Sequence, residues 1–297
     1  MTAPAWLWVV FTIVAATAQT FRNATQRSLT ETLGTTGATH IRFLFGLPFG
    51  LLALAIVSAA YGGVLVPSLP AVAWTVLGAV SQIVATALML AAMRERSFVV
   101  TIAYTKTEPI QVALFAVVFL GEQVTPLLAA AILVATAGVL ALSWPSRAGS
   151  EIFSWRPAIL GVVSGGLFAL AAVAFRGGIT ALGEVPFLPA ATLTLAMSLT
   201  VQTVLLSAWL ALRDPAALRA VLAAWRPSLP AGFLGAFASE MWFLAFAIQS
   251  PARVRTLGLV EILVAGMVSR RLFAQAPGAR DIAGMVLVVV GIALLFE

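Results

Sequence analysis

Residues 98–120 read FVVTIAYTKTEPIQVALFAVVFL, an apolar run that is long enough to cross a bilayer and carries two charges near its middle. The charges belong to Lys106, the only lysine of the chain, and to Glu108, and Pro109 follows directly. A charge at membrane depth costs at least ~2.5 kcal/mol, so it persists where another group uses or pairs it. Pro109 is expected to kink the helix beside the charges. The run therefore predicts a bent helix that lines a cavity; the alternative is an ion pair that only ties two helices together.

The composition places the chain in a membrane. Of its 297 residues, 61% are hydrophobic and 9% charged, and the mean hydropathy is +1.05, which is more than a soluble domain needs. We expect an all-α, multi-pass protein of the cell inner (plasma) membrane. With no cysteine and one histidine the chain lacks the ligands of an ordinary zinc site, and it has no phosphate-binding loop. We therefore expect no metal, no cofactor and no ATPase activity. The arginines lie in short loops, where they report topology and not a nucleic-acid partner.

Ten apolar runs divide the chain, and short connections separate them. We expect a transmembrane helix in each run. The runs are Pro4–Ser28, Thr36–Ala60, Leu69–Ala92, Phe98–Leu120, Thr125–Trp144, Arg156–Leu182, Phe187–Leu212, Leu229–Ser250, Ala252–Phe273 and Ala279–Phe296. The longest connection, residues 213–227, is expected to form an amphipathic surface helix with Leu218, Val221, Leu222 and Trp225 on one side.

The two halves of the chain, residues 1–150 and 151–297, repeat a spacing of polar residues and glycine. The two sets are Glu108, Glu122, Gly138 and Glu261, Gln275, Gly291, with separations of 14 and 16 residues in each. Two shorter pieces also recur: Phe21-Arg22 as Phe175-Arg176, and Leu77-Gly78-Ala79 as Leu234-Gly235-Ala236. Five helices per half make the second half enter the membrane from the opposite side. We therefore expect one transmembrane domain of two inverted five-helix repeats around a central cavity.

The fourth run ends in the turn Gly121-Glu122, and the next run carries a glycine. Together with ten helices in two halves, this pattern resembles the EamA type of the drug/metabolite transporter (DMT) superfamily, and within it the YddG branch of amino-acid exporters. The resemblance covers essentially the whole chain. It implies a ten-helix carrier that exports small metabolites by alternating access, with both termini in the cytoplasm. In the second half Ala274-Gln275 replaces the Gly-Glu turn.

The arginines argue for the opposite orientation. Most loop arginines, among them Arg94, Arg147 and Arg219, lie in odd-numbered loops, whereas the even loops hold only Arg253 and Arg255. Because positive residues favour the cytoplasmic side, this distribution places both termini outside. Both orientations stay open at this point, and an inverted repeat would build the same internal site in either.

Polar residues at mid-membrane depth form the expected substrate or ion site. Its candidates are Lys106, Glu108, Tyr104, Arg42, Gln82, Trp242, Glu240 and Glu261, with Pro109 as the hinge. On a continuous helix Tyr104 and Glu108 share one face, and Lys106 points the other way. We expect Glu261 or Glu240 to pair with Lys106.

A secondary carrier for small polar or zwitterionic metabolites, with amino acids favoured, is the function that this cluster predicts. A zwitterion needs an anionic partner for its ammonium and a donor for its carboxylate, and the cluster offers both. A multidrug or cation exporter of the same fold is one alternative, and an intramembrane enzyme or a lipid scramblase is another. We expect a monomer in contact with lipid, because spacings such as Gly161 to Gly165 serve helix packing within the chain. Arg22 lies nearer a helix end, from which its side chain is expected to reach the membrane surface.

Overall fold

The computed structural model describes residues 4–63, 65–95, 101, 104–143, 155–263 and 279–297. Every regular element in these ranges is a helix. The helices are α1 (Leu7–Leu44), α2 (Leu47–Tyr61), α3 (Leu69–Glu95), α5 (Glu108–Leu120), α6 (Pro126–Ser143), α7 (Trp155–Thr180), α8 (Phe187–Arg213), α9 (Pro215–Ala223), α10 (Trp225–Ile248), α11 (Pro251–Leu257) and α13 (Ala279–Ala293). Within them, five stretches are long and apolar enough to cross a membrane, and three further apolar helices are shorter. The expected all-helical character is confirmed for the described residues.

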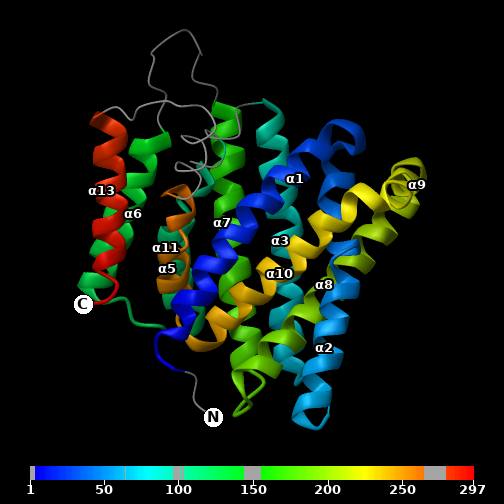
Figure 1. Ribbon diagram of the computed structural model, residues 1–297, viewed down its shortest axis with the longest axis horizontal. Helices are drawn as coiled ribbons and strands as arrows, with labels where there is room; N and C mark the ends of the chain where they lie inside the picture. Colours follow the sequence, from blue (N-terminus) through cyan, green and yellow to red (C-terminus); the bar gives the residue numbers. More distant parts are fainter. Residues whose placement is uncertain (1–3, 64, 96–100, 102–103, 144–154, 264–278) are drawn as a thin grey trace.

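The helices pack as pairs of segments that are far apart in the sequence. Helix α1 packs along α10, and both cross the molecule diagonally in Figure 1, while α3 packs along α7. Helices α6 and α13 lie together at one side of the molecule, and α2 packs on α8 at the other. The short helices α5 and α11 contact each other between these groups. The first turn of α1 and the last turn of α13 point to the same end of the molecule (Figure 1).

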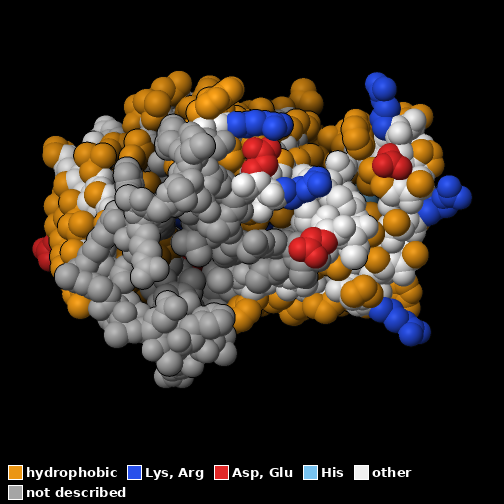
Figure 2. Space-filling model, turned by 90° about the horizontal axis from the view of Figure 1, so that it is seen from above, with side chains coloured by type: hydrophobic (Ala, Val, Ile, Leu, Met, Phe, Trp, Pro, Cys, Tyr) orange, Lys and Arg blue, Asp and Glu red, His pale blue; other side chains and the backbone are white. Residues whose placement is uncertain are grey.

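The surface of the bundle is apolar around its circumference. In Figure 2, which looks onto one end, hydrophobic side chains form most of the outline, and charged side chains gather on the end face and at the α9 end. Leu114 and Val118 of α5 are 61% and 65% exposed. Small residues such as Ala169 and Ala172 of α7 are fully buried. Large apolar side chains outside and small ones between helices are typical of a bundle embedded in lipid.

Glycine sets the closest helix contacts. A Cβ atom on Gly138 would lie 2.7 Å from the carbonyl oxygen of Gly284, and one on Gly291 would lie 2.5 Å from the backbone nitrogen of Ala135. Because these neighbours are backbone atoms, they cannot move aside as a flexible side chain would. Glycine at both positions is therefore what allows α6 and α13 to touch along their backbones.

The first two predicted runs are divided differently in the structure. The predicted gap after Ser28 is helical, because α1 continues to Leu44 across a kink at Gly34 (φ 67°, ψ 175°). The run Thr36–Ala60 is instead interrupted at Phe45-Gly46, before α2 begins. A Cβ atom on Gly46 would lie 3.1 Å from the Gly232 carbonyl oxygen of α10, so this interruption is a point of close backbone approach.

The fourth predicted run is also not one continuous helix. Turn residues Lys106 and Thr107 separate it from α5, which starts at Glu108. The kink expected at Pro109 is therefore an interruption that precedes the proline, and Pro109 occupies the first turn of α5, where its missing N–H costs nothing. The ninth run begins as α11, and the predicted spacing partner Gln275 lies outside the described residues, as does Arg147.

The Gly-Glu turn closes α5 as a left-handed cap. Gly121 has φ 65°, and the Glu122 N–H donates to the Ala116 carbonyl at 3.2 Å. Partial burial raises the pKa of the Glu122 carboxyl, and the nearby Arg176 guanidinium opposes that shift.

The long connection between α8 and α10 does form a helix. It is α9, and the Asp214 side chain caps it by accepting from the Ala217 N–H at 2.9 Å. The predicted apolar face is only partly buried: Val221 is fully covered, but Leu222 and Trp225 are 51% and 47% exposed.

Candidate functional site

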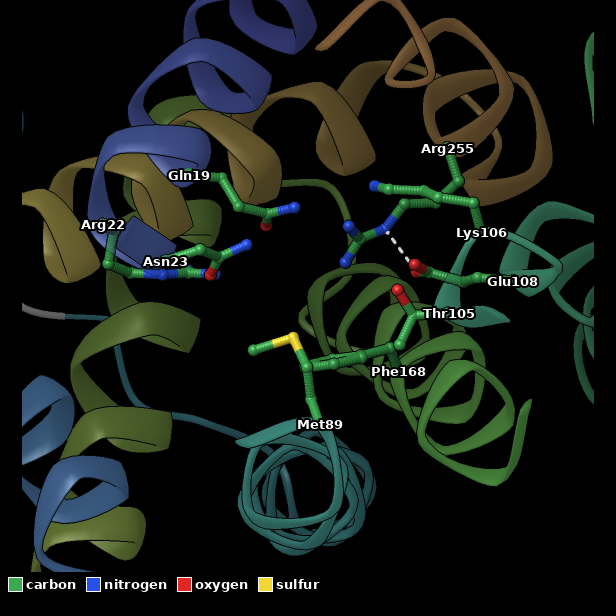
Figure 3. Close-up of a pocket in the computed structure, with 9 residues that line it drawn as sticks. All are labelled: Gln19, Arg22, Asn23, Met89, Thr105, Lys106, Glu108, Phe168 and Arg255. Atoms are coloured by element: carbon green, nitrogen blue, oxygen red, sulfur yellow. Dashed lines mark hydrogen bonds and ion pairs between the residues drawn. The ribbon is translucent and has the colours of Figure 1, made fainter. Parts of the chain in front are cut away.

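Two interrupted segments meet at the centre of the bundle and bring four charges together. One is the turn Lys106-Thr107 before α5, and the other follows α11, where residues 258 and 259 form a turn. Lys106 Nζ pairs with Glu261 Oε1. The Arg255 Nε and Glu108 Oε1 atoms lie 3.1 Å apart (Figure 3). All four side chains are less than 10% exposed, so both ion pairs are buried.

The contact of Arg255 with Glu108 is electrostatic rather than a well-formed hydrogen bond. Although its two atoms lie 3.1 Å apart, neither meets the hydrogen-bond geometry with any partner in the described residues. The Arg255 guanidinium also stacks over the Trp242 ring, with Cζ 4.3 Å from the ring centroid. The Trp242 ring thus holds the Arg255 guanidinium from one side. The Arg255 Nε–H lies close to the Glu108 carboxylate but is not aligned with it as in a hydrogen bond.

Gln19 of α1 links the charged pairs to α10. Its Nε2 donates to Glu261 Oε2 at 3.3 Å, and its Oε1 accepts from Trp242 Nε1 at 3.0 Å. A chain of polar contacts therefore runs from Trp242 through Gln19 and Glu261 to Lys106. It joins α10 and α1 to both interrupted segments.

Small residues on α7 position the segment before α5. A Cβ atom on Gly161 would lie 2.5 Å from the Tyr104 Cβ, and one on Gly165 would lie 2.9 Å from the Thr105 carbonyl oxygen. The expectation that this glycine spacing serves packing within the chain is therefore confirmed. At the interruption, the Thr107 hydroxyl donates to the Tyr104 carbonyl at 2.9 Å. That bond satisfies a backbone acceptor which a regular helix would have satisfied.

A small cavity lies between these elements. Its lining residues are Gln19, Arg22 and Asn23 of α1, Met89 of α3, Phe168 of α7, Thr105, Lys106, Glu108 and Arg255 (Figure 3). Its volume is about 20 Å³, which is room for about one water molecule. Polar groups thus line most of a water-sized space.

Two further arginines lie beside this cavity, and both are 2% exposed. Arg22 Nη2 donates to Asn23 Oδ1 at 2.7 Å, while its Nε and Nη1 have no hydrogen-bond partner in the described part of the chain. Arg42 donates to Thr86 Oγ1 at 3.3 Å and to Ser239 Oγ at 3.4 Å, and its Nε is likewise unpaired there. Neither guanidinium forms an ion pair with a carboxylate among the residues described.

A second, larger cavity lies further along α1 and α3. It has a volume of about 440 Å³ and is lined by Thr30, Glu31, Gly34, Leu90, Met93 and Arg94. Met89 of the small cavity and Leu90 of the large one are neighbours in sequence. The two cavities are therefore lined in part by consecutive residues of α3.

The structure brings five of the predicted site residues together and places others elsewhere. Lys106, Glu108, Trp242 and Glu261 belong to the central cluster, and Tyr104 packs directly beside it on Gly161. Arg42 lies next to the cluster.

The other two predicted residues contact different partners. Gln82 accepts from Gln202 Nε2 at 2.8 Å, and Glu240 accepts from the Thr192 hydroxyl at 2.6 Å. Of the two carboxylates expected to pair with Lys106, Glu261 is confirmed and Glu240 is not its partner. Glu108, the next choice, pairs with Arg255 instead.

The expectation that Lys106 and Glu108 face different environments is wrong, because it assumed a continuous helix. The helix is interrupted between them, and both line the same cavity. Arg22 and Arg255 also lie deeper in the protein than their positions in the sequence predicted. Arg22 does not reach the membrane surface, and Arg255, taken as a loop residue, is 8% exposed. The sequence features that could have indicated their positions are the recurrence of Phe-Arg in both halves and the location of Arg255 in an even-numbered connection, where only Arg253 accompanies it.

The described residues contain no group of three or more His, Cys, Asp or Glu side chains that could hold a metal ion. No family model matches the sequence, and no curated protein matches it. Among solved structures, 28 chains match. One of them, described only as "Crystal structure of protein", aligns over 98% of this chain and 94% of its own, with a TM-score of 0.69 and 18% sequence identity. At that identity the match shows a shared fold over nearly the whole chain.

Proposed function

We propose that this protein is a secondary carrier of the DMT type that exports small metabolites across the inner (plasma) membrane by alternating access, with amino acids as the first candidate substrates. One observation carries the proposal: two interrupted helical segments, at Lys106-Thr107 and after Leu257, surround a buried cavity with charges of both signs. Carriers commonly build their sites at the membrane midplane from such interrupted helices. An ion pair that only tied two helices together would need neither the interruptions nor the cavity.

The helix packing supports two inverted five-helix repeats and ten membrane crossings. Exchanging the halves exchanges α1 with α7 and α3 with α10. The observed pairs α1 with α10 and α7 with α3 then map onto each other, and α6 with α13 and α2 with α8 map onto themselves. The two interruptions also fit, since one lies just before Glu108 and the other just before Glu261, its counterpart in the repeat.

The cavity supports binding of a zwitterionic substrate in a state more open than this one. A space of about 20 Å³ admits about one water, so an amino acid can enter only if the lining residues separate. The larger cavity next to it gives a direction for that opening. Movement of α3 at Met89 and Leu90 would join the two cavities, while the interrupted segments supply the points of bending.

Uptake into proteoliposomes tests the proposal. The purified protein is reconstituted, and entry of labelled amino acids is compared with protein-free liposomes. Saturable uptake that unlabelled substrate competes away is the expected result. Lys106→Met is expected to reduce it strongly and Arg226→Met, a change on an exposed side chain, is expected to leave it unchanged. Equal, small effects of both changes would contradict the proposal, and leakage of unrelated solutes would indicate a channel.

A further inference from the structure

The central cluster contains more positive than negative charge. In the described part of the chain its cations are Arg22, Lys106 and Arg255, with Arg42 directly beside them, and its carboxylates are Glu108 and Glu261. The two carboxylates are already engaged, one with Lys106 and the other with Arg255. Neither Arg22 nor Arg42 has an ion pair of its own among the described residues, and the Glu261 carboxylate, which attracts Arg22 from a longer distance, is already bound to Lys106.

These two arginines lie side by side. A Cβ atom on Gly235 of α10 would be 2.9 Å from Arg42 Cγ and 3.7 Å from Arg22 Cδ, so both side chains pass over the same glycine. Arg22 lines the cavity, and its free Nε and Nη1 donors belong to a side chain that is 98% buried. Figure 3 shows Arg22 and Asn23 on the wall opposite Arg255 and Glu108.

A buried guanidinium without an anion is an unfavourable arrangement. Arginine keeps its charge in proteins, and burying a charge is costly unless it is paired and hydrogen-bonded. Asn23, Thr86 and Ser239 provide only neutral oxygens. A guanidinium group presents a planar fork of N–H donors that matches a carboxylate or phosphate, and a second arginine beside it adds positive charge for the same anion.

We propose that the substrate carries a net negative charge, and that Arg22, backed by Arg42, binds its oxyanion group. This inference rests on the proposed carrier function and narrows its substrate class. A neutral zwitterion brings no net charge and would leave the excess uncompensated. An acidic amino acid or a dicarboxylate offsets it, while Glu108 and Glu261 stay available for an ammonium group.

Binding to the purified protein in lipid nanodiscs tests the substrate class separately from transport. The probes are L-glutamate, succinate and glycerol 3-phosphate as anions, with L-glutamine and L-lysine as neutral and cationic matches. Thermal unfolding midpoints titrated against each probe give the affinities. At least one anion is expected to bind about tenfold more tightly than glutamine, which corresponds to about 1.4 kcal/mol. Comparing the affinities of glutamate and succinate with that of glycerol 3-phosphate shows whether the site prefers a carboxylate or a phosphate.

Variants connect the selectivity to Arg22. Arg22→Gln is expected to weaken anion binding about 30-fold or more, because a charged group loses its buried partner. Arg22→Lys keeps the charge and is expected to retain part of the affinity. Arg176→Gln is the matched control: Arg176 stands at the repeat-equivalent position but donates to the Phe246 carbonyl, away from the cavity, and its loss is expected to leave anion binding unchanged.

The outcomes separate the two proposals. If glutamine or lysine binds as tightly as every anion, or if no anion binds, or if Arg22→Gln binds the anions like the wild type, the anionic substrate is wrong. If Arg22→Gln fails to fold, the anion affinities of Arg22→Lys and the probe series on the wild type test the inference instead. Neutral amino acids that are bound and transported equally well would leave the carrier standing and overturn the anion inference. Tight anion binding that depends on Arg22 but comes without any flux would support the anion inference and overturn the carrier function.

Discussion

Removing the ammonium of Lys106 is expected to cost about 3 kcal/mol of unfolding free energy. The side chains of Lys106 and Glu261 are 9% and 6% exposed. Loss of one partner of such a buried pair leaves an uncompensated charge, at a cost of about 3–5 kcal/mol. After Lys106→Met the Glu261 carboxylate keeps one hydrogen bond, from Gln19 at 3.3 Å. That bond offsets part of the cost of the unpaired carboxylate, so we expect the lower end of the range.

A double-mutant cycle measures this effect. The unfolding free energies of Lys106→Met, Glu261→Gln and the double variant are determined by denaturation in mixed micelles. The double variant is expected to lose less than the two single variants together, by about 2 kcal/mol. The matched control is the exposed pair of Arg156 with Glu95, 3.2 Å apart and 70% and 33% exposed, for which we expect a coupling below about 1 kcal/mol. Equal coupling energies in the two cycles would refute the reasoning.

Three further changes test the site. Glu108→Gln is expected to lower proteoliposome uptake while the protein stays folded, since Arg255 keeps its aromatic contact; normal uptake with normal gel filtration would make the carboxylate structural. Pro109→Ala allows α5 to extend toward the interruption, so we expect slower substrate exchange with binding largely intact, and unchanged exchange rates would argue against a hinge. Gly165→Ala places a Cβ 2.9 Å from the Thr105 carbonyl oxygen and is expected to cost about 1–3 kcal/mol of unfolding free energy. An unchanged thermal midpoint would show that this contact does not hold the segment.

Hydropathy predicted where helices occur but not where they break. A run such as Leu69–Ala92 is a local property of the chain, and α3 reproduces it as Leu69–Glu95. The kink at Gly34 uses a positive φ of 67°, which glycine allows but does not by itself predict. The interruption at Phe45-Gly46 coincides with a close approach to Gly232 of α10, and no local pattern records that contact. In the same way, Pro109 indicated a disturbance of the fourth run, but tertiary contacts of Tyr104 and Thr105 with α7 decide that it falls before the proline.

The site was predictable where it depended on the rarity of charge. Lys106, Glu108 and Glu261 stand out in apolar surroundings, and the structure brings them together. Glu240 stood out equally, but Thr192 binds it, and nothing in the sequence distinguishes the two glutamates. The burial of Arg255 was not predicted, because the connection after Ser250 folds into the short helix α11, which packs inside the bundle. Its burial is a consequence of packing, not of composition.

The central claim is that the charged cluster surrounds a substrate cavity and is not a sealed structural ion pair. The chain has no cysteine, so a single introduced cysteine reports accessibility without background. Met89→Cys lies on the cavity wall, and Leu195→Cys, in the packed core, is the control. In proteoliposomes, a water-soluble thiol reagent is predicted to modify Met89→Cys far faster than Leu195→Cys, and bound substrate is predicted to slow that reaction. If Met89→Cys is as unreactive as Leu195→Cys from both sides of the membrane, the cluster is structural and the account is contradicted.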